Sequence, residues 1–190
     1  MTSLQAQFKI VYGVWFMSKR IVYCDDSGQV FTFSDDWNTD DGKVKKLKYK
    51  LAPGKSVLPH IHPGTSQYFR VLSGQLTIRN GFKKMILTTG QEVKTGIGGQ
   101  HSQCNDTSEE VEVEEGYEPP IDIEPFFTAL PHAQKSRNFL KIMVFFSDFS
   151  HVVTSKSLLA RMIIKFFGCV GNIFGYRNWY LPHIKRFRDR

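Results

Sequence analysis

Two motifs decide the fold of this chain: GKSVLPHIHPGTSQYFRVLSG (residues 54–74) and GQEVKTGIGGQHSQCN (residues 90–105). In the first motif His60 and His62 stand two residues apart, and on a strand this spacing puts two side chains on the same face. Imidazole nitrogen is a common protein ligand of divalent transition metals. The pair therefore offers half of a metal site, and His101 of the second motif is the candidate third ligand.

Strand patterns surround and fill these motifs. Residues 44–51, VKKLKYKL, alternate between apolar residues and lysine, which predicts a strand with one buried face. Residues 75–87, QLTIRNGFKKMIL, predict a hairpin because Asn-Gly tolerates the positive φ angles of a tight turn. Residues 111–117, VEVEEGY, alternate again. Short strands joined by glycine-rich turns predict an antiparallel β-barrel, which can bring His101 beside the histidine pair.

The two motifs resemble those of the cupin superfamily. The positions that carry the resemblance are Gly54, His60, His62, Gln67 and Gly74 in the first motif, and Gly90, Gly96, Gly98, His101 and Asn105 in the second. With the flanking strands, the resemblance extends over residues 44–117. It implies an all-β fold, the double-stranded β-helix or cupin jelly-roll barrel. It also implies a metal in the barrel mouth, bound by the histidines of both motifs and the acidic residue of the first.

This chain departs from the family pattern at two positions. Gly96 replaces a proline, which loosens one turn. Gln67 replaces the glutamate ligand, so a neutral amide oxygen stands where the family has a carboxylate. The predicted metal set is therefore His60, His62, Gln67 and His101, with Fe, Zn, Ni or Mn as candidate ions. The alternative is a degenerate site in which Gln67 marks the loss of metal binding.

Alternation also predicts what lies around the site. Phe69 and Val71 share the parity of Gln67, and Gln103 shares that of His101, so all three are predicted to point inward and are candidates to line a pocket. For Phe69 and Val71 the simpler interpretation is that they belong to the core. The acidic run at residues 109–115 is expected to be a solvated strand face.

The chain is predicted to divide into an N-terminal extension with edge strands (1–40), a barrel core (41–118) and a C-terminal helical extension with a basic tail (119–190). Residues 151–190 hold eight Lys and Arg residues and one acid. A helix is predicted there, capped by Ser155 or Ser157 and ended by Gly168. Two interpretations of this helix stay open. It packs on the barrel or on a second copy of the chain, or it lies on an anionic membrane.

The amino-acid composition restricts the class of protein and its expected cellular setting. Hydrophobic residues make up 41% of the chain and charged residues 23%, as in folded proteins. The three cysteines show no CxxC spacing, so we expect a reducing, cytoplasmic setting, and no apolar run is long enough to predict a transmembrane helix. The net positive charge is confined to the tail, since residues 1–150 hold 17 basic and 17 acidic residues, and this argues against a nucleic-acid-binding surface on the body.

For function, the sequence favours a metal-dependent enzyme that acts on a small organic molecule by dioxygenation, isomerisation or dehydration, and a homodimer. The alternative is a non-catalytic small-molecule-binding protein that its basic tail recruits to a membrane or to a partner. The barrel by itself does not choose between them, because one fold hosts many activities.

Overall fold

We analysed a computed structural model of the 190-residue chain. It describes residues 19–188 except 25, 35–36 and 39–41. The first half of the predicted N-terminal extension and Arg190 of the predicted basic tail lie outside the described residues, and the side chains of residues 185–188 are not described.

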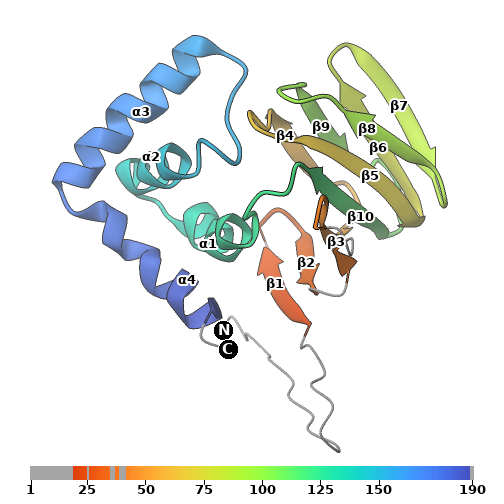
Figure 1. Cartoon of the computed structure of the whole chain (residues 1–190), viewed down its shortest axis with the longest axis horizontal. Coiled ribbons are helices and arrows are strands. Elements are labelled where there is room, and N and C mark those ends of the chain that lie inside the picture. The colour runs from red at the N-terminus through yellow and green to blue at the C-terminus, as the bar shows by residue number, and fades with distance from the viewer. Residues whose placement is uncertain (1–18, 25, 35–36, 39–41, 189–190) are drawn as a thin grey trace, which may run out of the picture.

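Within the described residues, ten strands form two antiparallel sheets (Figure 1). The six-stranded sheet has the order β1 (Arg20–Cys24), β2 (Gln29–Phe33), β3 (Lys45–Leu51), β10 (Val111–Glu118), β5 (Ser66–Ser73) and β8 (Glu92–Thr95). The four-stranded sheet has the order β4 (Ser56–His60), β9 (His101–Cys104), β6 (Gln75–Asn80) and β7 (Lys83–Thr88). One hydrophobic core joins residues of both sheets. The predicted all-β barrel with added C-terminal helices is confirmed.

Local patterns explain the strands. In β3 the apolar residues Leu47, Tyr49 and Leu51 are buried, as the alternation with lysine predicts. The predicted hairpin is formed by β6 and β7, and Gly81 in its turn has a φ of 62°. A side chain at that φ would strain the backbone, so glycine suits this turn.

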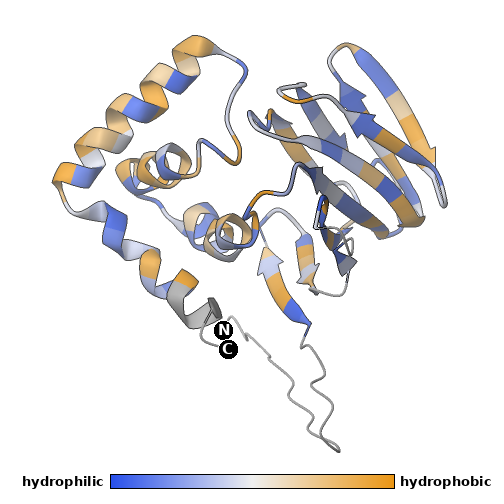
Figure 2. Ribbon diagram, in the orientation of Figure 1, coloured by the Kyte–Doolittle hydropathy of each residue, from blue (hydrophilic) through white to orange (hydrophobic). Residues whose placement is uncertain are grey.

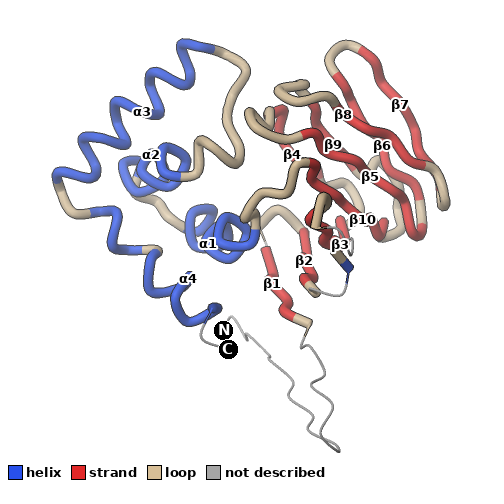
Figure 3. The backbone as a smooth tube through the Cα atoms, in the orientation of Figure 1, coloured by secondary structure: helices blue, strands red, loops and turns tan. Residues whose placement is uncertain are grey.

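The C-terminal helices gather on one side of the strands (Figure 3). They are α1 (Glu124–Lys135), α2 (Phe139–Asp148), α3 (Leu158–Ile173), the 3₁₀-helix η2 (Tyr176–Trp179) and α4 (Leu181–Arg188). Two contacts fix α1 to the sheet. The ring of Phe127 stacks on Phe31 with 3.9 Å between centroids, and Arg20 Nη2 donates to Glu124 Oε2 at 3.1 Å.

Helix α3 packs on α2 and is the outermost helix (Figure 1). Its N-cap is Ser157, one of the two predicted caps, whose hydroxyl accepts from Ala160 N. The prediction that Gly168 ends this helix is wrong, because the helix continues to Ile173. Gly168 has a packing role instead: a Cβ atom there would lie 2.4 Å from the Cβ of Ser147 in α2. The missing side chain therefore lets the two helices approach closely.

The linker between α2 and α3 returns to the barrel. Thr154 pairs with Ile61 as an isolated antiparallel bridge, with N–O distances of 2.9 and 3.0 Å. The helical layer is thus hydrogen-bonded to the segment that follows β4. Among the described helices, none has by itself the length and composition to span a bilayer, although α3 and residues 176–184 pass that test together as a pair bent by 87°.

Candidate metal site and its cavity

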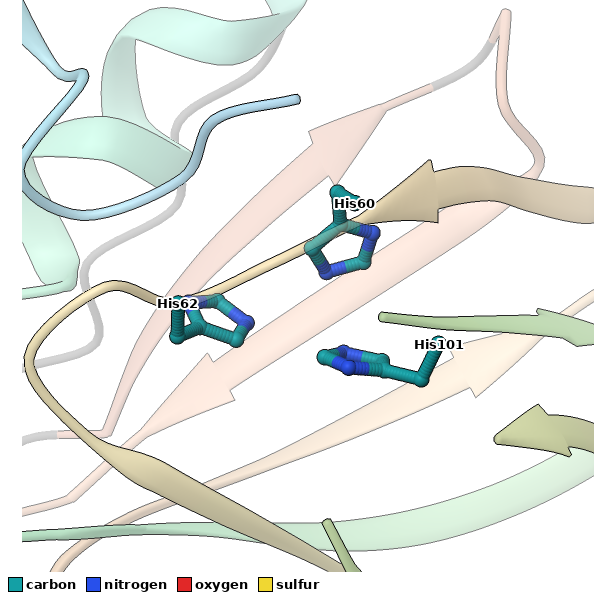
Figure 4. Close-up of side chains that lie close together, drawn as sticks. All are labelled: His60, His62 and His101. Atoms are coloured by element: carbon teal, nitrogen blue, oxygen red, sulfur yellow. The ribbon is translucent and has the colours of Figure 1, made fainter. Parts of the chain in front are cut away.

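Two paired strands bring the three motif histidines together (Figure 4). His60 ends β4, His101 begins β9, and the two are register partners in the antiparallel pair. His62 lies two residues beyond the end of β4. The ring centroids are 4.4 Å apart for His60 and His101, 5.0 Å for His60 and His62, and 5.4 Å for His62 and His101. One ring nitrogen from each lies within 4.8 Å of the other two.

Hydrogen bonds fix which nitrogen faces the centre of this group. The Nδ1 atom of His60 lies 2.8 Å from Leu58 O, that of His62 lies 2.7 Å from Val152 O, and that of His101 lies 3.0 Å from Gly99 O. A carbonyl oxygen only accepts, so each Nδ1 carries the proton and each Nε2 keeps a lone pair. This arrangement orients metal-binding histidines in known sites.

Three acceptor atoms near this centre have no partner among the residues that the structure describes. They are the Nε2 atoms of His62 and His101 and the Oε1 atom of Gln67, all buried. A buried polar atom without a hydrogen bond costs about 1–3 kcal/mol, so such a group needs an explanation. All three offer lone pairs and none offers a proton. A divalent cation fits this donor set.

The protonation of the histidines suits the same interpretation. Burial lowers the pKa of His62 to about 4 and that of His101 to about 3, and the neighbouring imidazoles lower both further. Burial lowers the pKa of His60 as well. All three rings are therefore neutral near pH 7, which is the form that binds a metal.

Gln67 is oriented by a chain of buried hydrogen bonds. Its Nε2 atom donates to Tyr117 Oη at 2.9 Å, and Tyr117 Oη donates to Glu115 Oε2 at 2.8 Å. Gln103 Nε2 approaches the other oxygen of Glu115 at 3.4 Å, and the hydroxyl of Tyr49 donates to Gln103 Oε1. Because Tyr117 uses its proton on the carboxylate, it can only accept from Gln67. The amide nitrogen therefore faces Tyr117, and Oε1 is left free as an acceptor.

Glu115 is the functional candidate that the sequence analysis missed. The prediction of a solvated acidic face is wrong at this residue, which is only 3% exposed. The alternation contained the signal, since Glu115 shares the parity of Val111, Val113 and Tyr117, which form the buried face of β10. Burial raises the pKa of Glu115 to about 7, against the opposing hydrogen bonds from Tyr117, Gln103 and Gln67. The carboxylate missing from the first motif is thus present behind Gln67.

A cavity of about 660 Å³ opens beside the site. The barrel contributes a polar wall to it, formed by His60, His62, Gln67, Gln103, Glu115 and Tyr117. The helices contribute an apolar wall, formed by Phe126, Phe127, Leu130, Met143, Phe146 and Ile164. Of the three predicted pocket residues, Gln103 lies in the polar wall, whereas Phe69 and Val71 are fully buried in the core.

Comparison with known proteins gives one family match. The sequence model described as the cupin domain matches residues 47–117, which begin within β3 and end one residue before the end of β10. No curated protein matches the chain.

Among solved structures, the chain is similar to KdgF from a Halomonas species, with 18% identity and a TM-score of 0.45 over 50% of this chain and 82% of that one. It is also similar to an RmlC-like cupin from Shewanella frigidimarina, with 16% identity and a TM-score of 0.45 over 63% of this chain and 97% of that one. A predicted oxalate decarboxylase from Thermotoga maritima gives 20% identity and a TM-score of 0.44 over 55% and 94%.

Proposed function

We propose that this chain, whose residues 47–117 match the sequence model of the cupin domain, is a metal-dependent enzyme that acts on a small organic molecule. His60, His62 and His101 would bind a divalent transition metal, with Gln67 as the fourth ligand or as a donor to a bound ligand. Imidazole and neutral oxygen ligands suit Fe, Zn, Ni and Mn.

One observation carries the proposal. Buried acceptor atoms of His62, His101 and Gln67 lack a partner among the described residues. Two of these residues, His62 and Gln67, line a cavity large enough for a small organic molecule. The metal would supply Lewis-acid polarisation of an oxygen atom on the bound molecule. None of the four ligand candidates carries a charge, so the ion would keep its full positive charge and favour an anionic or enolate-like ligand.

Metal content tests the site directly. Protein purified from metal-replete growth is analysed by inductively coupled plasma mass spectrometry beside the double variant His60→Ala/His101→Ala. We expect about one equivalent of metal in the wild type and a trace in the variant. The matched control is His151→Ala, an exposed histidine outside the site, which should keep its metal. Equal metal in wild type and double variant would overturn the proposal.

Catalysis is tested separately. The metal-loaded protein is incubated with a cell metabolite extract, and small molecules are compared by mass spectrometry with an incubation of the double variant. We expect consumption of at least one compound by the wild type alone. If no compound changes while the metal is present, the enzyme assignment fails and the protein is a binding cupin.

The exposed face of α3 favours a second candidate function, in which the cupin is a binding protein recruited to a surface. Hydrophobic residues recur along this helix (Figure 2). Five of the exposed ones are Leu158 (65% exposed), Leu159 (67%), Met162 (60%), Phe166 (64%) and Ile173 (79%). The helix packs mainly on α2, where Gly168 and Gly171 allow a close approach, and it leaves these five large side chains exposed.

Charge indicates which surface would cover α3. Residues 149–174, which include α3 and its flanks, contain three Lys and Arg residues and no Asp or Glu, and Lys156 and Lys165 are exposed beside and on the helix. A second copy of this face would bring like charges together with no acid on either face to pair them. We therefore propose that the partner is an anionic lipid surface, into which an apolar helix face with flanking cations can insert.

Flotation of the protein with liposomes tests this candidate. The protein should float with vesicles that contain phosphatidylserine and less with pure phosphatidylcholine vesicles. The variant Met162→Glu/Phe166→Glu should lose flotation, whereas Phe82→Glu, a fully exposed residue between β6 and β7, should keep it. If the wild type does not float but forms a dimer that Met162→Glu/Phe166→Glu abolishes, the face binds a second copy and the membrane proposal is overturned.

A further inference from the structure

The cavity beside the metal site has a barrel side, which combines polar side chains with Phe31, Val57, Leu58 and Pro59, and a helical side, which is almost wholly apolar. Its metal end is made by the barrel, where the polar side chains of His60, His62 and Gln67 are exposed to the cavity. Its other end is made by helices that lie outside the cupin domain. Of the seven residues that α1, α2 and α3 contribute, six are apolar, and Gln134 is the polar one. A ligand that fills this cavity must therefore present different chemistry at its two ends.

The apolar end is packed as part of the core. Phe127 stacks on Phe31 at 3.9 Å between centroids, and Phe126 stacks on Phe145 at 5.3 Å. Phe126 and Phe127 are only 5% and 8% exposed. Side chains held in this way form a wall that exists before a ligand arrives, and a preformed apolar wall gains affinity by removing apolar ligand surface from water.

The charges around the cavity restrict the ligand further. Among the lining residues there is no Lys or Arg, and the charged side chains are the carboxylates of Asp26 and Glu115. An anionic group on the ligand therefore has only the metal to neutralise it, so it belongs at the histidine end. A hydroxyl-rich body such as a sugar would lose water contacts against the aromatic wall without regaining hydrogen bonds there.

We infer that the cavity takes an amphipathic ligand, with a small oxygen-bearing anionic head at the histidine site and an uncharged apolar body between α1, α2 and α3. This inference rests on the proposed function for the position of the head only. The apolar body is placed by the helical wall, and it would be required whether or not the site holds a metal.

Ligands of increasing chain length test whether the apolar end of the cavity binds an apolar body. Straight-chain 2-oxo acids from pyruvate to 2-oxodecanoate are titrated into the full-length protein by isothermal calorimetry, with and without added Zn²⁺. Each buried methylene should raise the affinity about 4-fold, so that five methylenes give on the order of a thousandfold. Affinity that does not rise with chain length in either condition, or tighter binding of galacturonate than of 2-oxooctanoate, would overturn the inference.

Two adjacent residues of α3 supply a matched pair of variants. Ile164 lines the cavity, whereas Ile163 is 44% exposed on the outer side. In the Ile164→Trp variant the indole should fill the apolar end of the cavity. The longer acids should then lose their gain in affinity, while the affinity for pyruvate stays unchanged. The Ile163→Trp variant should behave as the wild type. An unchanged series in folded Ile164→Trp protein would contradict the placement of the body.

The titrations with and without Zn²⁺ distinguish the proposed metal site from the proposed ligand class. If Zn²⁺ leaves every affinity unchanged but the dependence on chain length persists, the metal site fails and the amphipathic ligand stands. If Zn²⁺ raises all affinities by one factor but they do not depend on chain length, the metal site stands and the ligand class is wrong.

Discussion

Replacing Tyr117 by phenylalanine tests how the buried network controls the metal site. The hydroxyl of Tyr117 accepts from Gln67 Nε2 and donates to Glu115 Oε2, so its removal leaves one buried donor and one buried acceptor unpaired. At about 1–3 kcal/mol each, the free energy of unfolding should fall by about 2–6 kcal/mol. The Gln67 amide would also be free to rotate, and loss of such an outer partner typically lowers metal affinity about 10–100-fold.

Tyr49→Phe is the matched control for this experiment. Tyr49 is also a fully buried tyrosine of the same network, but its hydroxyl bonds to Gln103, at the end remote from Gln67. It should therefore lose about 1–3 kcal/mol of stability and keep most of its metal affinity.

Urea denaturation measures the stability of both variants, and competition with a chromogenic chelator measures their metal affinity. Equal loss of metal affinity in the two variants, or none in Tyr117→Phe, would refute the reasoning that Tyr117 orients Gln67.

Three other predictions follow from the same contacts. The Gln67→Glu variant restores a charged ligand and should raise metal affinity at least about 10-fold in the chelator assay; an unchanged affinity would show that position 67 does not face the metal. In metal-free protein the raised pKa of Glu115, about 7 against an ordinary 4.5, means that the folded state binds this proton more tightly than the unfolded state. Stability from this residue is therefore present at low pH and lost as pH rises through about 7. Between pH 5 and pH 8 the free energy of unfolding of the wild type should fall by up to about 3 kcal/mol relative to that of Glu115→Gln. An equal change in the two proteins over this pH range would count against the prediction. Gly168→Ala places a Cβ against Ser147 and should cost about 1–3 kcal/mol in thermal unfolding, whereas the exposed Cys169→Ala should be neutral.

The features that the sequence predicted well are those with a local pattern. Alternation in residues 44–51 and the Asn80-Gly81 turn each determine a strand or hairpin by themselves. The spacing of His60 and His62 and the second motif around His101 indicated a histidine group that the barrel assembles. At Glu115 two sequence signals disagree, since its parity in the strand predicts burial whereas its charge predicts exposure. A buried carboxylate is rare, and its partners Tyr117 and Gln103 are recognised only once the strands are placed.

Other features had no local signal. Gly168 was predicted to end its helix because glycine often follows the last helical turn. In the structure Gly168 lies inside α3 and allows α2 to approach closely, and such a tertiary contact leaves no local pattern in the sequence. The apolar wall of the cavity is formed by three helices that are amphipathic in sequence. The spacing of their apolar residues predicts a buried face but does not predict that this face covers the barrel mouth. The contact of His62 with Val152 joins residues 90 positions apart, and only the folded chain shows it.

That contact makes the metal site and the helical layer parts of one thermodynamic cycle. His62 keeps its orientation through the carbonyl of Val152, in the linker that leads to α3 and that pairs with Ile61 through Thr154. If metal binding tightens when this linker is docked, docking must tighten by the same factor when the metal is bound. A bilayer that bound α3 more tightly in this docked state would act at a distance as an effector of the metal site, and loss of the metal would then weaken its binding by the same free energy.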